Sequence, residues 1–77
     1  MLELVSNALG NQDYYLCLYD HHLYIYHYLE ILSFNPDLIM VKLKDINLKI
    51  KGSNLLIKKM HEHELLIEGN LVSVQYE

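Results

Sequence analysis

The sequence predicts an all-β protein: a single antiparallel meander of about seven or eight short strands, curled into a roll or a small sandwich or barrel. Three observations predict it. Short runs alternate between apolar and polar residues, turn residues lie between the runs, and the apolar residues of successive runs fall on the same side of the predicted sheet. The 77 residues leave room for one domain. Within it we expect residues 1–19 to form an N-terminal strand or cover and residues 20–77 to form the meander.

The N-terminal part predicts two strands. Residues 14–18 and 23–26 alternate in the manner of strands, with a turn at residues 19–20 between them. Residues 1–9 are ambiguous between a strand and a short helix that ends near Gly10. We expect residues 1–28 to cover the meander that follows.

The middle of the chain predicts two hairpins. Residues 35–37 (Asn-Pro-Asp) suit a turn, because proline presets φ for the second turn position. A three-residue loop there places Ile31 opposite Val41. Residues 44–45 close the next hairpin and bring Leu48 to Val41.

Two glycines predict hairpin turns further on. Residues 52–53 (Gly-Ser) suit a type II′ turn, since glycine accepts the positive φ at the first central position. Residues 69–70 (Gly-Asn) repeat the pattern. These turns predict the pairs Ile50 with Leu55 and Ile67 with Val72.

A loop at residues 61–63 would set Ile57 against Ile67. With this loop, the alternating apolar residues stay on the same side of the sheet after every turn. The residues predicted to share one side of the sheet are Leu29, Ile31, Ile39, Val41, Leu43, Ile46, Leu48, Ile50, Leu55, Ile57, Leu65, Ile67, Val72 and Val74. The other side is also apolar, with Leu32, Phe34, Leu38, Met40, Leu56, Leu66 and Leu71 beside lysines. A sheet that is apolar on both sides must be covered twice, curl up or bind a partner.

Two stretches form a recognisable pattern, IKGSNLLIK at residues 50–58 followed by ELLIEG at residues 64–69. With these stretches as its strongest part, the chain from Leu23 onward resembles the YabP/YqfC family of sporulation proteins, and the YqfC branch most closely. The chain departs from the family in lacking a glycine in the turn at residues 27–30.

The resemblance implies a non-enzymatic structural or adaptor module in spore-envelope (coat or cortex) assembly. It implies a place in the mother-cell cytoplasm, peripheral at the outer surface of the forespore, and a YqfD-like membrane sporulation protein as partner. The alternative is a small β domain that binds a metal ion or single-stranded nucleic acid.

No catalytic residue, cofactor site or metal site is predicted. His61 and His63 could ligate an ion together with Cys17 or Glu64, but no established ligand spacing supports this. Cys17, between two leucines, is predicted to be a small buried hydrophobic residue. No nucleophile can be named together with a base and an oxyanion donor.

The charge and the aromatic residues of the chain indicate which kinds of partner it could bind. Tyr24, Tyr26 and Tyr28 alternate and predict an aromatic row. The net charge of −4 and the absence of arginine argue against nucleic acid, and no apolar run is long enough to span a membrane. A homo-oligomer could form through a sheet edge or the outer face. The predicted interaction surface comprises Tyr24, Tyr26, Phe34, Met40, Lys49, Lys51, Leu56 and Lys58.

Overall fold

A computed structural model describes residues 14–77, which form one antiparallel sheet of six strands. The strands are β1 (Tyr15–Tyr19), β2 (His22–Tyr26), β3 (Glu30–Asn35), β4 (Leu38–Leu43), β5 (Ile46–Met60) and β6 (Glu64–Tyr76). Their order across the sheet is β1-β2-β6-β5-β4-β3. The predicted all-β class is confirmed, with six strands in place of seven or eight, and the sheet is not closed into a barrel.

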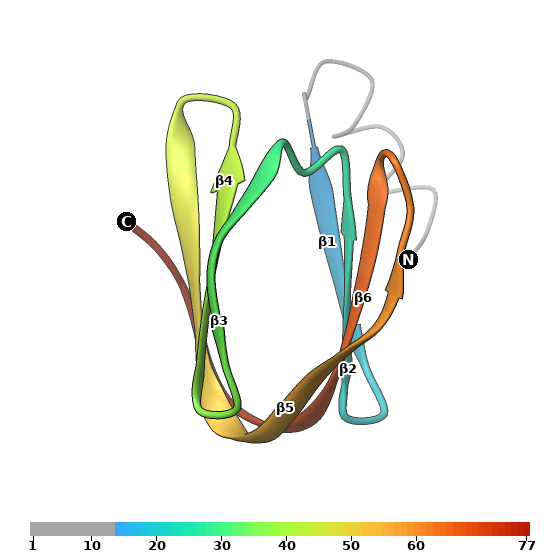
Figure 1. Ribbon diagram of the computed structural model, residues 1–77, viewed down its shortest axis with the longest axis vertical. Coiled ribbons are helices and arrows are strands. Elements are labelled where there is room, and N and C mark those ends of the chain that lie inside the picture. Colours follow the sequence, from blue (N-terminus) through green and yellow to red (C-terminus); the bar gives the residue numbers. More distant parts are fainter. Residues whose placement is uncertain (1–13) are drawn as a thin grey trace.

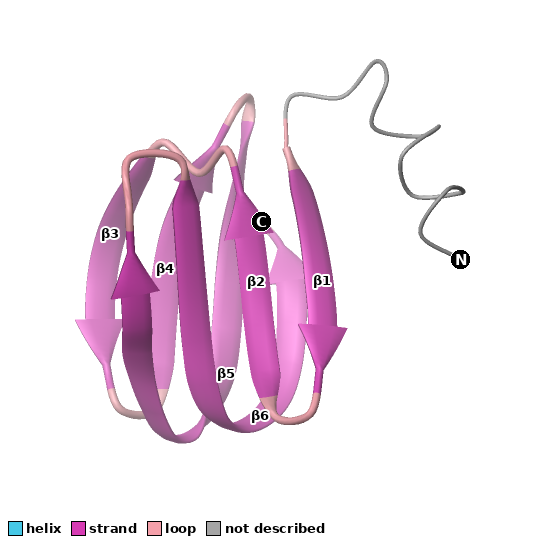
Figure 2. Cartoon of the chain, turned by 90° about the vertical axis from the view of Figure 1, so that its right-hand side faces the viewer, coloured by secondary structure: helices cyan, strands magenta, loops and turns pink. Residues whose placement is uncertain are grey.

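The sheet folds over on itself because β5 and β6 are long and bent (Figure 1). The early part of β5 and the late part of β6 lie with β3 and β4, and we call this half the β3–β4 layer. The late part of β5 and the early part of β6 lie with β1 and β2 in the β1–β2 layer. Figure 2 shows the same arrangement from the side, with β1 at one edge of the sheet.

The bend lies where Gly52 of β5 meets the segment around Gly69 of β6, and three register shifts mark this strand pair. A Cβ atom at Gly52 would overlap the Asn70 carbonyl oxygen. Gly69 has φ of 145°, and a Cβ there would lie 2.7 Å from the Asn54 carbonyl oxygen. Only glycine fits this close approach of two backbones.

The two predicted glycine hairpins are therefore wrong. Gly52 pairs with Leu71 and Ser53 with Asn70 at the corner of one bent ribbon, and neither glycine closes a hairpin. As a result Ile50 lies opposite Val74 rather than Leu55. A hairpin turn and a β-bulge can both require a positive φ, which glycine adopts easily, so a glycine in the sequence is compatible with either.

The core fills the space between the two layers. Its fully buried members are Leu23, Ile25, Ile39, Val41, Leu43, Leu48, Ile50, Leu55, Leu65 and Ile67. Ile31, Ile46, Ile57, Leu71 and Val74 pack partly against them. The bend thus lets one sheet cover its own apolar side, a role we had expected residues 1–28 to fill.

Four side chains of the predicted core or outer side lie elsewhere, and one of them, Phe34, is on the inner side because β3 is bulged at Leu32. Val72 is 77% exposed, because it is the extra residue of a bulge and the alternation reverses there, so that Leu71 faces the core instead. Leu29 is 60% exposed, since it lies in the connection before β3, although its N–H donates to the Lys42 carbonyl. A bulge depends on how a strand pairs with a distant strand, so it cannot be located from the alternation of residues along the sequence.

The residue pairs predicted across the short turns are confirmed. Ile31 pairs with Val41, Val41 with Leu48, and Ile57 with Ile67. The β3–β4 loop has two residues rather than three, and a register shift between Ile31 and Ser33 absorbs the difference.

The N-terminal hairpin has its turn one residue later than predicted. Asp20 and His21 form it, with φ of 41° and 61°, as a two-residue hairpin of the I′ kind requires. The expectations for residues 1–9 fall outside the described residues. In the part that is described, no helix has the length and hydropathy to cross a membrane.

Candidate interaction surface

The outer side of the β1–β2 layer carries most of the tyrosines, and we call it the aromatic face. On β1 and β2, Tyr15 lies opposite Tyr26, Cys17 opposite Tyr24 and Tyr19 opposite His22. These positions alternate with Leu23 and Ile25, which are buried on the inner side. The remaining members of the aromatic face come from β5 and β6: Leu56, Lys59, Glu64, Leu66 and Glu68.

The rings of the aromatic face contact one another across strands. Tyr15 stacks on Tyr26 with centroids 5.1 Å apart and contacts Tyr24 at 5.9 Å. Tyr19 stacks on His22 at 5.3 Å. Each such cross-strand pair stabilises a sheet by about 0.2–1 kcal/mol and restricts the rotamers of both rings.

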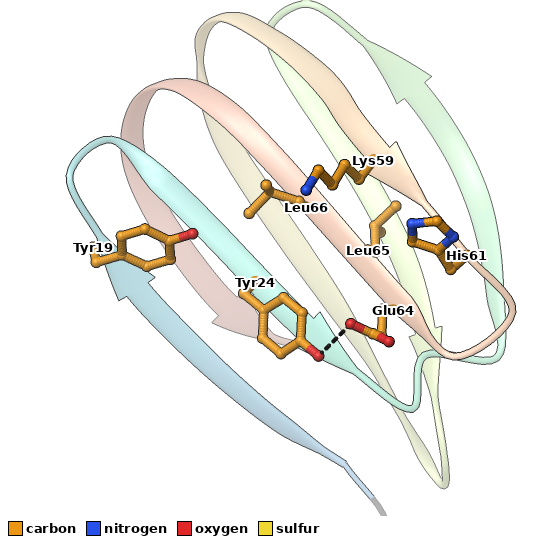
Figure 3. Close-up of a pocket in the computed structure, with 7 residues that line it drawn as sticks. All are labelled: Tyr19, Tyr24, Lys59, His61, Glu64, Leu65 and Leu66. Atoms are coloured by element: carbon orange, nitrogen blue, oxygen red, sulfur yellow. Dashed lines mark hydrogen bonds between the residues drawn. The ribbon is translucent and has the colours of Figure 1, made fainter. Parts of the chain in front are cut away.

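Tyr24 is joined to Glu64 across the β2–β6 pair. Its hydroxyl donates a hydrogen bond of 2.8 Å to Glu64 Oε1, shown as a dashed line in Figure 3. Burial, followed by the hydrogen bond and the charge of Glu64, raises the pKa of Tyr24 well above its ordinary value. Tyr24 is therefore a neutral donor, and Glu64 holds its ring in one orientation.

Glu68 carries the second carboxylate of the aromatic face. Lys58 Nζ lies 3.6 Å from Glu68 Oε1, and His22 Nε2 lies 3.9 Å from Glu68 Oε2. The Nδ1 of the same histidine contacts the Asp20 carbonyl at 2.6 Å. These partly exposed pairs orient side chains more than they stabilise the fold.

A shallow hollow of about 210 Å³ opens on the aromatic face (Figure 3). It is lined by Tyr19, Tyr24, Lys59, His61, Glu64, Leu65 and Leu66. Small-molecule sites usually enclose about 300–1,000 Å³, so this hollow is smaller than a typical one.

The predicted interaction surface is divided between three places. Tyr24, Tyr26 and Leu56 lie on the aromatic face, and Lys58 reaches it through Glu68. The register places Met40, Lys49 and Lys51 on the outer side of the β3–β4 layer. Phe34 lies opposite buried Ile39, at the edge of the inner side.

Tyr15 and Tyr19 belong to this surface, although they were not predicted as members of it. The alternation of residues 15–19 contained the signal, because an antiparallel hairpin brings their odd-numbered side chains to the side of Tyr24 and Tyr26.

The predicted tyrosine row ends at Tyr26. His27 has φ of 67°, which breaks the alternation, and its N–H donates to the His63 carbonyl. Tyr28 consequently packs against the core, and its hydroxyl donates to the His61 carbonyl at 3.0 Å.

Cys17 is not a core residue, contrary to prediction. The leucines on either side of it point to the inner side, so its thiol lies half-buried on the aromatic face opposite Tyr24. His61 and His63 are exposed in the connection after β5. Within residues 14–77, no three side chains of the His, Cys, Asp or Glu type are grouped to hold a metal ion.

The chain matches the YabP family over residues 16–77. No curated protein matches it. The matched stretch includes nearly all of the described sheet, from the second residue of β1 to beyond the end of β6, and excludes only the first fifteen residues. The chain therefore belongs to the YabP family, and this makes it a sporulation-related protein.

Proposed function

We propose that this protein is a non-enzymatic adaptor in spore-envelope assembly, and that the aromatic face is its docking surface for another protein. The partner we propose is a YqfD-like membrane sporulation protein, met in the mother-cell cytoplasm at the outer surface of the forespore. Family membership supports the sporulation setting.

The observation that carries the docking role is the cluster of five rings, exposed or half-buried, on the outer side of one layer of the domain. The rings belong to Tyr15, Tyr19, His22, Tyr24 and Tyr26. Tyrosine is enriched at the centres of protein interfaces, where it contributes a large contact area with few rotatable bonds. Because stacking already fixes several of these rings, binding would cost little side-chain entropy.

The charges of the aromatic face favour a protein over a nucleic acid. Two carboxylates, Glu64 and Glu68, lie among the rings, and the nearby cations Lys58 and Lys59 only offset them. A surface that tracks a phosphate backbone needs a clear excess of positive charge. A mixed polar rim around aromatic anchors is typical of protein interfaces.

Co-purification with the YqfD-like protein from detergent-solubilised membranes tests this proposal. We expect Leu56→Lys and Tyr19→Ser to weaken capture by about tenfold or more, as loss of an interface anchor does. Both side chains are about half exposed, so both variants should fold. Val72→Lys, at the exposed bulge of β6, is the matched control and should leave capture unchanged.

Capture that survives both face variants while their circular dichroism remains native would contradict the docking surface. A fluorescent fusion in sporulating cells tests the location separately. We expect a rim around the forespore that disperses when the gene of the membrane partner is deleted; dispersed fluorescence in the wild type would contradict the proposed location.

A further inference from the structure

We propose that two copies of this chain associate through their β1 edges, in an antiparallel pair centred on Cys17. This inference is independent of the proposed docking partner. It follows from a comparison of the sheet edges in the part of the chain that is described.

Every other edge among residues 14–77 carries a feature that discourages strand addition. The edge strand β3 begins at the charged Glu30 and is bulged at Leu32. The late part of β5 carries Lys58 and Lys59, and the late part of β6 is bulged at Val72. Charges and bulges are the usual means of protecting an edge from pairing with a second molecule.

The edge strand β1 has none of these features. Its sequence YLCLY contains no charge and no proline, and its register against β2 has no shift. Leu18 on this strand is 63% exposed. An uncharged, regular edge with an exposed leucine is a template for strand addition.

The sequence of β1 is also symmetric about Cys17, which selects a second copy as the occupant. In an antiparallel pair centred there, each Leu16 would face Leu18 of the second copy, and each Tyr15 would face Tyr19 of the second copy. Every pair joins like side chains, and no like charges meet. A two-fold interface requires such self-complementarity.

The backbone N–H and C=O groups of β1 point in the directions that this pairing requires. In a two-residue hairpin the residues that flank the turn form a hydrogen-bonded pair, here Tyr19 and His22. Alternation then directs the backbone groups of Cys17 toward β2 and those of Leu16 and Leu18 toward the free edge. The two Cys17 residues would occupy a non-hydrogen-bonded site, where Cα atoms lie about 4.5 Å apart.

That spacing allows the thiol to serve as a reporter, because disulfides form at Cα separations of about 4.4–6.8 Å. The dimer itself needs no disulfide. Its two sheets would continue into each other, and the two aromatic faces would meet along the row of Tyr15, Cys17 and Tyr19.

The test uses the full chain under reducing conditions in sedimentation equilibrium, followed by mild oxidation with copper phenanthroline. We expect the dimer fraction to rise with concentration and the Cys17 disulfide to form in proportion to it. Leu18→Pro removes one N–H directed at the free edge and leaves the β2 pairing intact, so it should weaken association by about tenfold or more. Leu18→Lys should do the same, and Leu29→Lys, at a similarly exposed leucine outside β1, should behave as wild type.

A chain that stays monomeric up to millimolar concentration would overturn the proposal. So would a dimer whose cross-linking is insensitive to Leu18→Pro. Hydrogen exchange provides the third check: the Leu16 and Leu18 amides should exchange fast in dilute protein and slow in concentrated protein. Protection of these amides already in the dilute monomer would mean that the edge is occupied within one chain, and would overturn the pairing.

Discussion

Tyr24 and Glu64, which are forty residues apart in sequence, are joined by a 2.8 Å hydrogen bond across the β2–β6 pair. This contact joins the second strand of the chain to the last one, and it exists only because β6 inserts beside β2. It fixes the central ring of the aromatic face and borders the hollow there.

The Tyr24–Glu64 contact predicts a specific pH dependence. Tyr24→Phe should lower the free energy of unfolding by about 0.5–1 kcal/mol at neutral pH, since one partly exposed hydrogen bond is lost. The pKa of Tyr24 is raised in the folded state by burial first and by Glu64 second. The stability this provides is complete below the unfolded value of about 10 and is lost as pH rises above it, because the unfolded chain then releases the proton first.

Urea unfolding of the wild type and of Tyr24→Phe at about pH 8 and about pH 11 measures this effect. The stability advantage of the wild type should shrink at the higher pH, while the other tyrosines cancel between the two proteins. An advantage that is equal at both pH values would contradict the assignment.

We expect the corner of the sheet to tolerate only glycine at position 69. Gly69→Ala places a methyl group at φ of 145° and 2.7 Å from the Asn54 carbonyl oxygen, so we expect a loss of about 1–3 kcal/mol in stability. Ser53→Ala, at an exposed site of the same corner, is the control and should change stability by less than about 0.5 kcal/mol. Thermal unfolding of both variants measures these effects, and a loss from Gly69→Ala no larger than that from Ser53→Ala would contradict the close approach at the corner.

Substitution of the two adjacent leucines after the corner should lower stability by very different amounts. Leu55 is buried in the core, whereas Leu56 is 47% exposed on the aromatic face. Leu55→Ala should cost about 2–5 kcal/mol and Leu56→Ala less than about 1 kcal/mol in denaturant unfolding. Similar losses from the two variants would contradict the placement of Leu55 on the inner side and of Leu56 on the outer side of the sheet.

The β1–β2 turn predicts a stabilising change. Asp20 and His21 both have positive φ, which costs a residue with a side chain about 1–2 kcal/mol relative to the right-handed region. The double variant Asp20→Asn with His21→Gly supplies the pair that type I′ turns prefer and should raise the free energy of unfolding by about 0.5–1 kcal/mol. His21→Ala alone should give no gain, and a gain of the same size from it would argue against a backbone effect.

Much of the fold could be predicted from the sequence because it depends on local chemistry. Alternation placed Val41 and Leu48 on one side, and short turns between polar residues set the pairing of β3, β4 and β5. Tyr24 and Tyr26 of the candidate surface were found in the same way, from alternation within one strand. Tyr15 and Tyr19 were not found, although the same rule applies to them.

The sequence by itself determined the all-β class and the alternation within the short strands, and it marked Gly52 and Gly69 as special positions. Only the tertiary structure decided what Gly52 and Gly69 do. Each glycine could close its own hairpin, but in the fold the two meet at a corner, because full-length pairing of β5 with β6 sets Ile50 against Val74 and Ile57 against Ile67. That pairing buries one side of the sheet against itself, and such a gain is a property of the whole chain that no local turn preference can reveal.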